Sequence, residues 1–186
     1  MKRFAKTLGA ACLAASALAA MGAAGASAAL FTASETGQLT GTSTGAHVFT
    51  PGGGGTVTCN HDHMIGTIVS TEAASQHVRV VHTQCTAFGF APTLTEGTFE
   101  LHANGEVDIE NTITYTAFGC STSIKPQKGL KGVSYTSSGG KLTLHFALKG
   151  IVSTTTGFPC SGGTTGTTTG SFVIERAGGG TLGWHP

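Results

Sequence analysis

The sequence predicts an all-β protein folded as an antiparallel sandwich and stabilised by disulfides, with a closed barrel as the alternative. Three observations predict this class. Apolar residues alternate with polar ones in short runs, glycine interrupts these runs about every 8–12 residues, and no window has the 3.6-residue period of a helix. Disorder is the rival explanation for so much Gly, Ser and Thr, but a disordered chain lacks regularly spaced apolar residues.

Residues 1–28 are predicted to be a secretory signal peptide, so the protein is expected to be secreted. Lys2, Arg3 and Lys6 form a positive segment, and an uncharged segment rich in alanine and leucine follows. Small residues at positions 26–28 then predict cleavage before Ala29. A membrane anchor is the alternative, but the apolar segment barely reaches the roughly 20 residues of a transmembrane helix and ends at the cleavage motif.

Residues 29–176 are predicted to form one domain, because their number suits a single hydrophobic core. The glycine-rich residues 177–186 are expected to be a flexible C-terminal tail. After cleavage, seven Lys and Arg residues remain against nine Asp and Glu residues, so the net charge is about −2. A nearly neutral surface without a basic stripe argues against nucleic acid or an anionic membrane as the partner. No later segment reaches transmembrane length.

The cysteines beyond the signal peptide are Cys59, Cys85, Cys120 and Cys160. An even number in an exported chain predicts two disulfides, and the absence of a C-x-x-C pair argues against a zinc site. Residues 57–69 and 78–85 have the pattern of a hairpin that turns near 72–75. In that register Cys59 lies opposite Cys85, which leaves Cys120 to pair with Cys160.

The clearest hairpin spans residues 98–111 around an Asn-Gly pair at 104–105. A turn made by these two residues would place Leu101 opposite Asp108, so each face would mix apolar and charged side chains. A type I turn one residue earlier, followed by a left-handed glycine, pairs Leu101 with Val107 instead. The separation of the two faces therefore favours the second turn.

Further strands are predicted in the second half of the chain. A hairpin over residues 132–149 turns around Ser138-Gly139 and pairs Tyr135 with Leu142 and Val133 with Leu144. Shorter strands are expected at 113–117, 151–155 and 171–176, of which the last is the final strand. The glycine-rich segments 51–55 and 162–170 are expected to be loops.

Three groups of residues form a distinctive set of strand and turn motifs. They are His47-Val48-Phe49-Thr50 with Gly55-Thr56-Val57-Thr58-Cys59, then Cys85-Thr86-Ala87-Phe88-Gly89-Phe90, then the Gly-Thr-Gly repeats after Cys160. This set resembles a family of secreted actinobacterial proteins of unknown function. The resemblance implies a Gly/Thr-rich, disulfide-bonded, all-β fold and imports no activity. Many such chains carry a further cysteine pair where Gly97 and Asn111 stand here, so the resemblance implies the loss of a third bridge.

His61 and His63 are the sharpest candidate metal ligands in the sequence. On a strand, two histidines separated by one residue share a face about 7 Å apart, where they could hold a metal with a third ligand such as His82. The Cys59–Cys85 register, however, gives the odd-numbered residues of both strands one face and places His82 and Asp62 on the other. We therefore expect no tight metal site at His61 and His63, and no cofactor.

Two other patterns suggest chemistry. The segment Gly41-Thr42-Ser43-Thr44-Gly45 matches the G-x-S-x-G elbow of hydrolases, but the residues after it lack the helical period that this motif needs. A carboxylate pair on the Asn-Gly hairpin could serve glycoside hydrolysis or Ca²⁺ binding. It belongs to an outward face expected to be solvated, made of Glu100, His102, Glu106 and Asp108.

One basic cluster, Lys125, Lys128 and Lys131, suits solubility or an acidic wall polymer. Taken together, the residues predict a secreted, non-enzymatic β domain with a structural or adhesive role at the cell surface or in the medium. A hydrolase is disfavoured because no nucleophile, base and orienting residue form a recognisable set. The alternative function is a secreted carrier of a metal or small ligand that uses His61 and His63.

Overall fold

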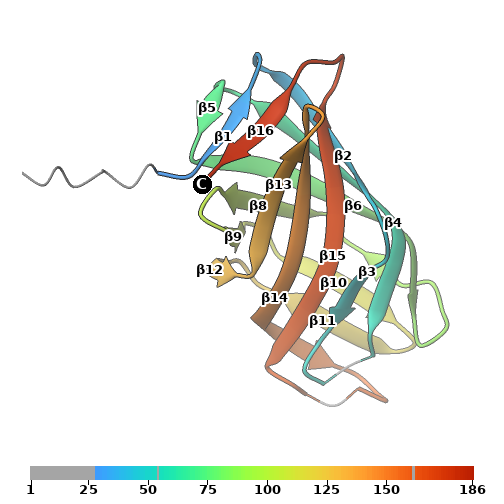
Figure 1. Ribbon diagram of the computed structural model, residues 1–186. Coiled ribbons are helices and arrows are strands. Elements are labelled where there is room, and N and C mark those ends of the chain that lie inside the picture. The colour runs from blue at the N-terminus through green and yellow to red at the C-terminus, as the bar shows by residue number, and fades with distance from the viewer. Residues whose placement is uncertain (1–27, 54, 161) are drawn as a thin grey trace, which may run out of the picture.

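The computed structural model describes residues 28–53, 55–160 and 162–186 (Figure 1). These residues form sixteen strands and no helix, so the predicted all-β class is confirmed. The predicted signal peptide lies outside the described residues, apart from its last position. The strands are β1 (Leu30–Ala33), β2 (Gly37–Ser43), β3 (His47–Thr50), β4 (Val57–Ile68), β5 (Glu72–Ala73), β6 (Ser75–Ala87), β7 (Thr93–Leu94), β8 (Gly97–His102), β9 (Glu106–Ile109), β10 (Ile113–Ala117), β11 (Cys120–Ile124), β12 (Gln127–Lys131), β13 (Val133–Ser138), β14 (Lys141–Thr156), β15 (Thr165–Arg176) and β16 (Leu182–His185).

Thirteen of these strands form one antiparallel sheet that curves around a common core (Figure 1). The hydrogen-bonded order of the described strands runs β12-β9-β8-β6-β4-β2-β15-β14-β11-β10-β7. β13 pairs with β14, and β3 continues the line of β2 between β15 and β4. The two halves of the sheet pack their inner faces together, which is the predicted sandwich arrangement.

The core follows the alternation seen in the sequence. Leu142, Leu144 and Leu148 of β14 point inward at every second position and pack in one cluster with Val78 and Val80 of β6. Each of these side chains is at most 5% exposed. Burial of a Leu or Val side chain stabilises the fold by about 1.5–3 kcal/mol, so the alternating residues account for the closure of the sheet.

A smaller sheet of order β16-β1-β5 covers one end of the core. Trp184 of β16 packs against the core, and its indole N–H donates to the carbonyl of Ala103 at 2.8 Å. The prediction of a flexible tail over residues 177–186 is therefore wrong, because Leu182–His185 form the strand β16, which pairs with β1. The sequence signal was weak because this strand is short and follows three consecutive glycines.

The Asn-Gly hairpin has the predicted register. Leu101 pairs with Val107 and Phe99 pairs with Ile109, while Gly105 adopts a left-handed φ of +87°. The paired register ends at Phe99 and Ile109, two positions before Gly97 and Asn111, where the resemblance implied a lost bridge. There the Asn111 amide side chain contacts two backbone groups, accepting from the Thr98 N–H and donating to the Glu96 carbonyl.

The hairpin of β13 and β14 differs from its predicted register by two positions. Gly139 and Gly140 are both left-handed, with φ of +58° and +76°, and they form a two-residue turn. Tyr135 consequently pairs with Leu144 and Val133 with Phe146. A shift of two keeps every side chain on its predicted face, so the burial pattern was correct although the pairing was not.

The last two long strands are more extended than expected. β14 continues through residues 151–155 without a break, after a register irregularity next to the left-handed Gly150. Residues 165–170, expected as a loop, form the first half of β15 and pair with β14. Runs of Thr and Gly usually indicate a loop. In β15, however, neighbouring strands on both sides supply the ladder hydrogen bonds.

Both disulfides occur in the predicted pairing. Cys59 and Cys85 join β4 to β6, and Cys120 and Cys160 join β11 to the segment between β14 and β15. Two disulfides fit an oxidising compartment. Within the described ranges, no helix is long and apolar enough to cross a membrane.

Candidate functional site

Among the described residues, Asp62 has the most deeply buried charged side chain, and the arrangement of β2, β3 and β4 explains its position. The space between β15 and β4 is filled first by β2 and then by β3. Residues 44–46 connect these two strands and leave the sheet. Asp62 of β4 lies beside this interruption, where no backbone carbonyl of β2 or β3 can accept its N–H. That N–H instead donates to the Ser43 hydroxyl at 3.0 Å.

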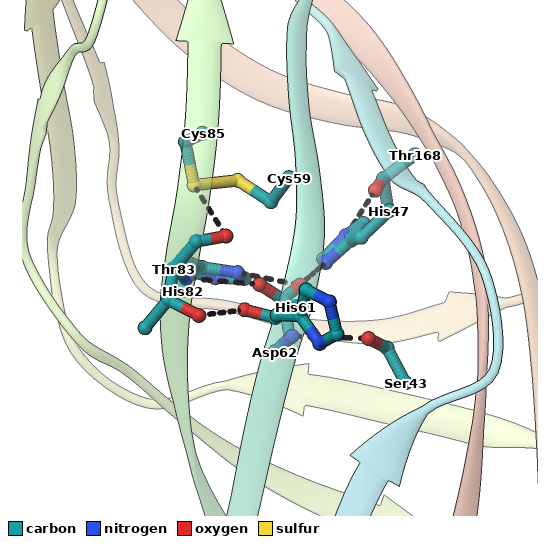
Figure 2. The surroundings of a disulfide bond; sticks show 9 residues. All are labelled: Ser43, His47, Cys59, His61, Asp62, His82, Thr83, Cys85 and Thr168. Carbon is teal, nitrogen blue, oxygen red and sulfur yellow. Dashed lines mark hydrogen bonds and ion pairs between the residues drawn. A yellow bond between two sulfur atoms is a disulfide. The ribbon is translucent and has the colours of Figure 1, made fainter.

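Two histidines converge on the Asp62 carboxylate (Figure 2). His47 begins β3 and places Nδ1 2.7 Å from Asp62 Oδ2, and His82 of β6 places Nδ1 2.9 Å from the same oxygen. The other carboxylate oxygen accepts the Thr83 backbone N–H at 3.3 Å. The side chain of Asp62 is fully buried, and those of His47 and His82 are 14% and 8% exposed.

The pKa values of His47 and Asp62 both lie below their ordinary values. Burial lowers the pKa of His47 below its ordinary value, although the hydrogen bond to Asp62 opposes this effect. Burial alone would raise the pKa of Asp62, but the hydrogen bonds to His47 and His82 outweigh burial and hold this pKa below its ordinary range.

The far side of His47 is also fixed. Its Nε2 lies 2.8 Å from Thr168 Oγ1, and the Thr168 hydroxyl donates to the Val48 carbonyl at 3.0 Å. The ring of Phe146 packs edge-on against the imidazole at a centroid distance of 4.9 Å. The orientation of His47 is therefore determined on each side of the ring.

A cavity of about 110 Å³ lies in the core beside this cluster. Its wall is almost wholly apolar, and the polar side chains on it are those of His47, His82, Tyr115 and Thr168. Tyr115 is 3% exposed and its phenolic oxygen has no hydrogen-bond partner within the described residues. Burial raises the pKa of this phenol and outweighs the opposite effect of the Thr122 side chain, whose hydroxyl is also hydrogen-bonded to Thr155.

The predicted candidates His61 and His63 do not join this site. Both are exposed on the outer face of β4, whereas His82 pairs directly with Asp62 on the inner face. The prediction that His82 and Asp62 lie opposite His61 and His63 is therefore correct. The accompanying assumption that Cys59 shares the face of His61 is wrong.

The error has a local cause. Gln84 adopts a left-handed φ of +53° between the Cys59–Cys85 pair and the pair formed by His61 and Thr83. Both strands change face there without changing register, so Cys59 and Asp62 both point inward although they are three positions apart. Strict alternation from Cys59 places Asp62 outside, and this misplacement hid the cluster from sequence reasoning.

The hairpin face expected to be solvated is partly covered. Asp108 is 7% exposed because β12 packs beside β9, and its carboxylate accepts the Gly129 N–H at 2.7 Å. Glu100 pairs with Asp108 across the strands and accepts a hydrogen bond from Ser75. Of the basic cluster, Lys128 lies 3.9 Å from Asp108, so these carboxylates have protein partners.

The G-x-S-x-G segment ends β2 and is followed by the strand β3, not by a helix. Ser43 accepts the Asp62 N–H and helps to position the carboxylate. Thr168, His47 and Asp62 do contact one another in the order of a nucleophile, base and orienting acid. Thr168, however, lies mid-strand, pairs on both sides with Phe49 and Leu148, and is 8% exposed.

Four phenylalanines are exposed in the loops that follow β6, β10 and β14. Phe88, Phe90, Phe118 and Phe158 are 40%, 54%, 60% and 90% exposed, and the rings of Phe90 and Phe118 stack at 5.1 Å. Phe88 and Phe118 adopt left-handed φ values of +53° and +49°, which are unusual for bulky residues.

The chain matches no protein-family model, no curated protein and no solved structure. The site itself combines a buried His-Asp-His cluster with an apolar cavity that His47 and His82 line.

Proposed function

We propose that the protein acts outside the cell as a non-enzymatic carrier of a small, largely apolar molecule with one hydrogen-bonding group. The observation that carries the proposal is the apolar cavity, whose lining includes Tyr115, a residue with an unpartnered phenolic oxygen. A void of about 110 Å³ lowers the stability of a protein by about 2–3 kcal/mol. An unpaired buried hydroxyl costs about 1–3 kcal/mol more. An occupant would relieve both costs.

The size of the cavity limits the molecule. An engineered cavity of roughly 150 Å³ accepts benzene, so this cavity suits a single ring or a short branched chain. The apolar wall supplies most of the contact area, and Tyr115 supplies one hydrogen bond. We therefore propose that the carrier function depends on Tyr115 and the cavity, and not on the exposed His61 and His63.

Melting temperatures in the presence of phenol and toluene test this proposal. We expect both compounds to raise the melting temperature and phenol to bind more tightly, because only phenol can pair with Tyr115. In Tyr115→Phe the preference for phenol should disappear while toluene still binds. The proposal is wrong if neither compound shifts the melting temperature at millimolar concentration, or if Tyr115→Phe keeps the full preference.

Export is part of the proposal. The predicted signal peptide supports it, and so do two disulfides, since these persist in oxidising compartments. N-terminal sequencing of protein from the culture medium should begin at Ala29. Recovery of chains that begin at Met1 from the membrane fraction would contradict export.

The non-enzymatic part is supported by the surroundings of Thr168. A nucleophile needs an accessible carbonyl position with backbone N–H donors around it, as in an oxyanion hole. The strand residues paired with Thr168 commit their backbone groups to the ladders, and its hydroxyl donates to Val48. If Thr168 were a nucleophile, the unaltered protein would hydrolyse small esters and Thr168→Val would not. We expect neither protein to hydrolyse them.

A second candidate function is adhesion to the cell wall, and the exposed phenylalanines favour it. Exposed apolar clusters mark interaction surfaces, and here the Cys120–Cys160 bridge holds the loops of Phe118 and Phe158. Co-sedimentation with isolated cell walls tests adhesion. We expect Phe118→Ser with Phe158→Ser to abolish sedimentation; an unchanged pellet would count against this surface.

A further inference from the structure

The directions of the hydrogen bonds around His47 leave its Nδ1 atom available to a proton or a metal ion. The Thr168 hydroxyl has one proton, and it is directed at the Val48 carbonyl. At its contact with His47, the Thr168 oxygen must therefore accept, so His47 carries a proton on Nε2. Thr168 thus fixes one ring proton of His47 on Nε2, which leaves Nδ1 to contact Asp62 either as a second N–H or as a metal ligand.

Because Nδ1 of His47 lies 2.7 Å from Asp62 Oδ2, a proton or a metal ion must lie between the two atoms. His82 directs its own Nδ1 to the same Oδ2 atom at 2.9 Å, so two imidazole nitrogens converge on one carboxylate oxygen. The three ligand atoms, two imidazole nitrogens and one carboxylate oxygen, all lie within 4.8 Å of one another. A single metal ion would satisfy all three at once.

We propose that His47, Asp62 and His82 bind one divalent transition-metal ion through Nδ1, Oδ2 and Nδ1, respectively. Two imidazoles and one carboxylate are a donor set suited to Zn²⁺, Co²⁺ or Cu²⁺ and not to Ca²⁺ or Mg²⁺. Ligand atoms around four-coordinate zinc lie roughly 3.3 Å apart. The present separations of 2.7 and 2.9 Å therefore need to widen by only about half an ångström.

The surroundings have the features that metal sites require. Metal-bound histidines usually donate their second ring N–H to an oxygen, and the contact of His47 Nε2 with Thr168 supplies this. The backbone N–H of Thr83 donates to the second carboxylate oxygen of Asp62 and orients it. His47 and His82 both line the cavity, so a fourth coordination position can be taken by water or by a cavity ligand.

Cys59 and Cys85 lie close by but do not add ligands, because their sulfur atoms are bonded to each other (Figure 2). The site is therefore made by three strands, β3, β4 and β6, whose mutual register the disulfide helps to fix. This inference is independent of the proposed carrier function, because the metal ligands differ from Tyr115.

Calorimetric titration of the oxidised protein, treated with EDTA beforehand, with Zn²⁺ tests the inference. We expect one ion per chain with a dissociation constant below about 1 μM. His47→Ala, His82→Ala and Asp62→Asn should each weaken binding at least 100-fold. The matched controls are His61→Ala and His63→Ala, which remove exposed histidines from the outer face of the same sheet and should leave binding unchanged.

Titration with Co²⁺ provides a measurement on the unaltered protein, in case the buried substitutions prevent folding. Binding at the proposed site should give the intense visible absorption of four-coordinate Co²⁺, which Zn²⁺ then displaces. The proposal is refuted if the unaltered protein binds Zn²⁺ no more tightly than about 100 μM. It is also refuted if His61→Ala or His63→Ala abolishes binding while His82→Ala retains it.

Discussion

Removal of the two disulfides one at a time should separate stability from site geometry. The closed loops span 26 residues for Cys59–Cys85 and 40 for Cys120–Cys160. In the chain-entropy model these loops contribute about 3.5 and 3.9 kcal/mol to the free energy of unfolding. Replacing either pair with alanines should therefore lower the urea-derived stability by nearly the same amount.

The two variants should differ in metal binding. Cys59 and Cys85 face each other in the same ladder as Asp62 and His82, three positions away on each strand. Loss of this bridge releases the register at the face change near Gln84, so we expect Zn²⁺ affinity to fall at least tenfold. The Cys120–Cys160 bridge joins loops outside this ladder, and its loss should leave the affinity unchanged.

Both measurements are made in water, well below the unfolding midpoint, so that each variant is fully folded during the titration. Equal Zn²⁺ affinity in the two variants would show that the Cys59–Cys85 bridge does not position His82. A stability difference of more than about 2 kcal/mol between them would show that native-state strain, not loop entropy, dominates.

Four further predictions concern the stability of the fold. Val80→Ile adds one methylene towards the cavity and should raise the free energy of unfolding by up to about 0.8 kcal/mol in urea titrations; a loss of 1 kcal/mol or more would show that the space is already filled. Tyr115→Phe removes an unpaired hydroxyl and should be neutral or stabilising, whereas Tyr135→Phe removes a hydrogen bond to a carbonyl and should cost about 1 kcal/mol; the reverse order would contradict this assignment of partners. Burial raises the pKa of both tyrosines, so above about pH 10 the unfolded chain releases protons that the folded state keeps, and stability should fall as the pH rises further; a flat profile in denaturation at pH 9–11 would oppose this. Gly105→Ala forces a Cβ to within 2.7 Å of the Val133 carbonyl at a φ of +87° and should cost more than 1 kcal/mol, with an unaltered melting temperature as the contrary result.

The fold was predictable where alternation and turn chemistry agree. Leu101 and Val107 identified their hairpin because only one turn separates apolar from charged residues, and the cysteine pairing followed from a second hairpin of constant register. The β13–β14 register was missed because two adjacent glycines allow more than one turn. β16 was missed because pairing with a distant strand, which no local pattern records, is what orders it.

The site was harder to predict than the fold. Asp62 and His82 were correctly placed together, opposite His61 and His63, but which face was the interior depended on the unusual conformation of Gln84. His47 gave no signal of its own, because its position beside Asp62 depends on the passage from β2 to β3 within one ladder. A sequence pattern reports neighbours along a strand, whereas this cluster is assembled across three.

Because β1 pairs with β16, the small sheet can form only after Leu182–His185 are available. The Thr181 N–H donates to the Ser34 hydroxyl across 147 positions of sequence, and Leu30 pairs with His185. A chain that emerges from its N-terminal end, during synthesis or translocation, has to wait for Leu182–His185 before β1 finds its partner. Until then one end of the core stays uncovered, and such long-range closure is slow. For the proposed export as an extended chain, this delay would favour passage before folding.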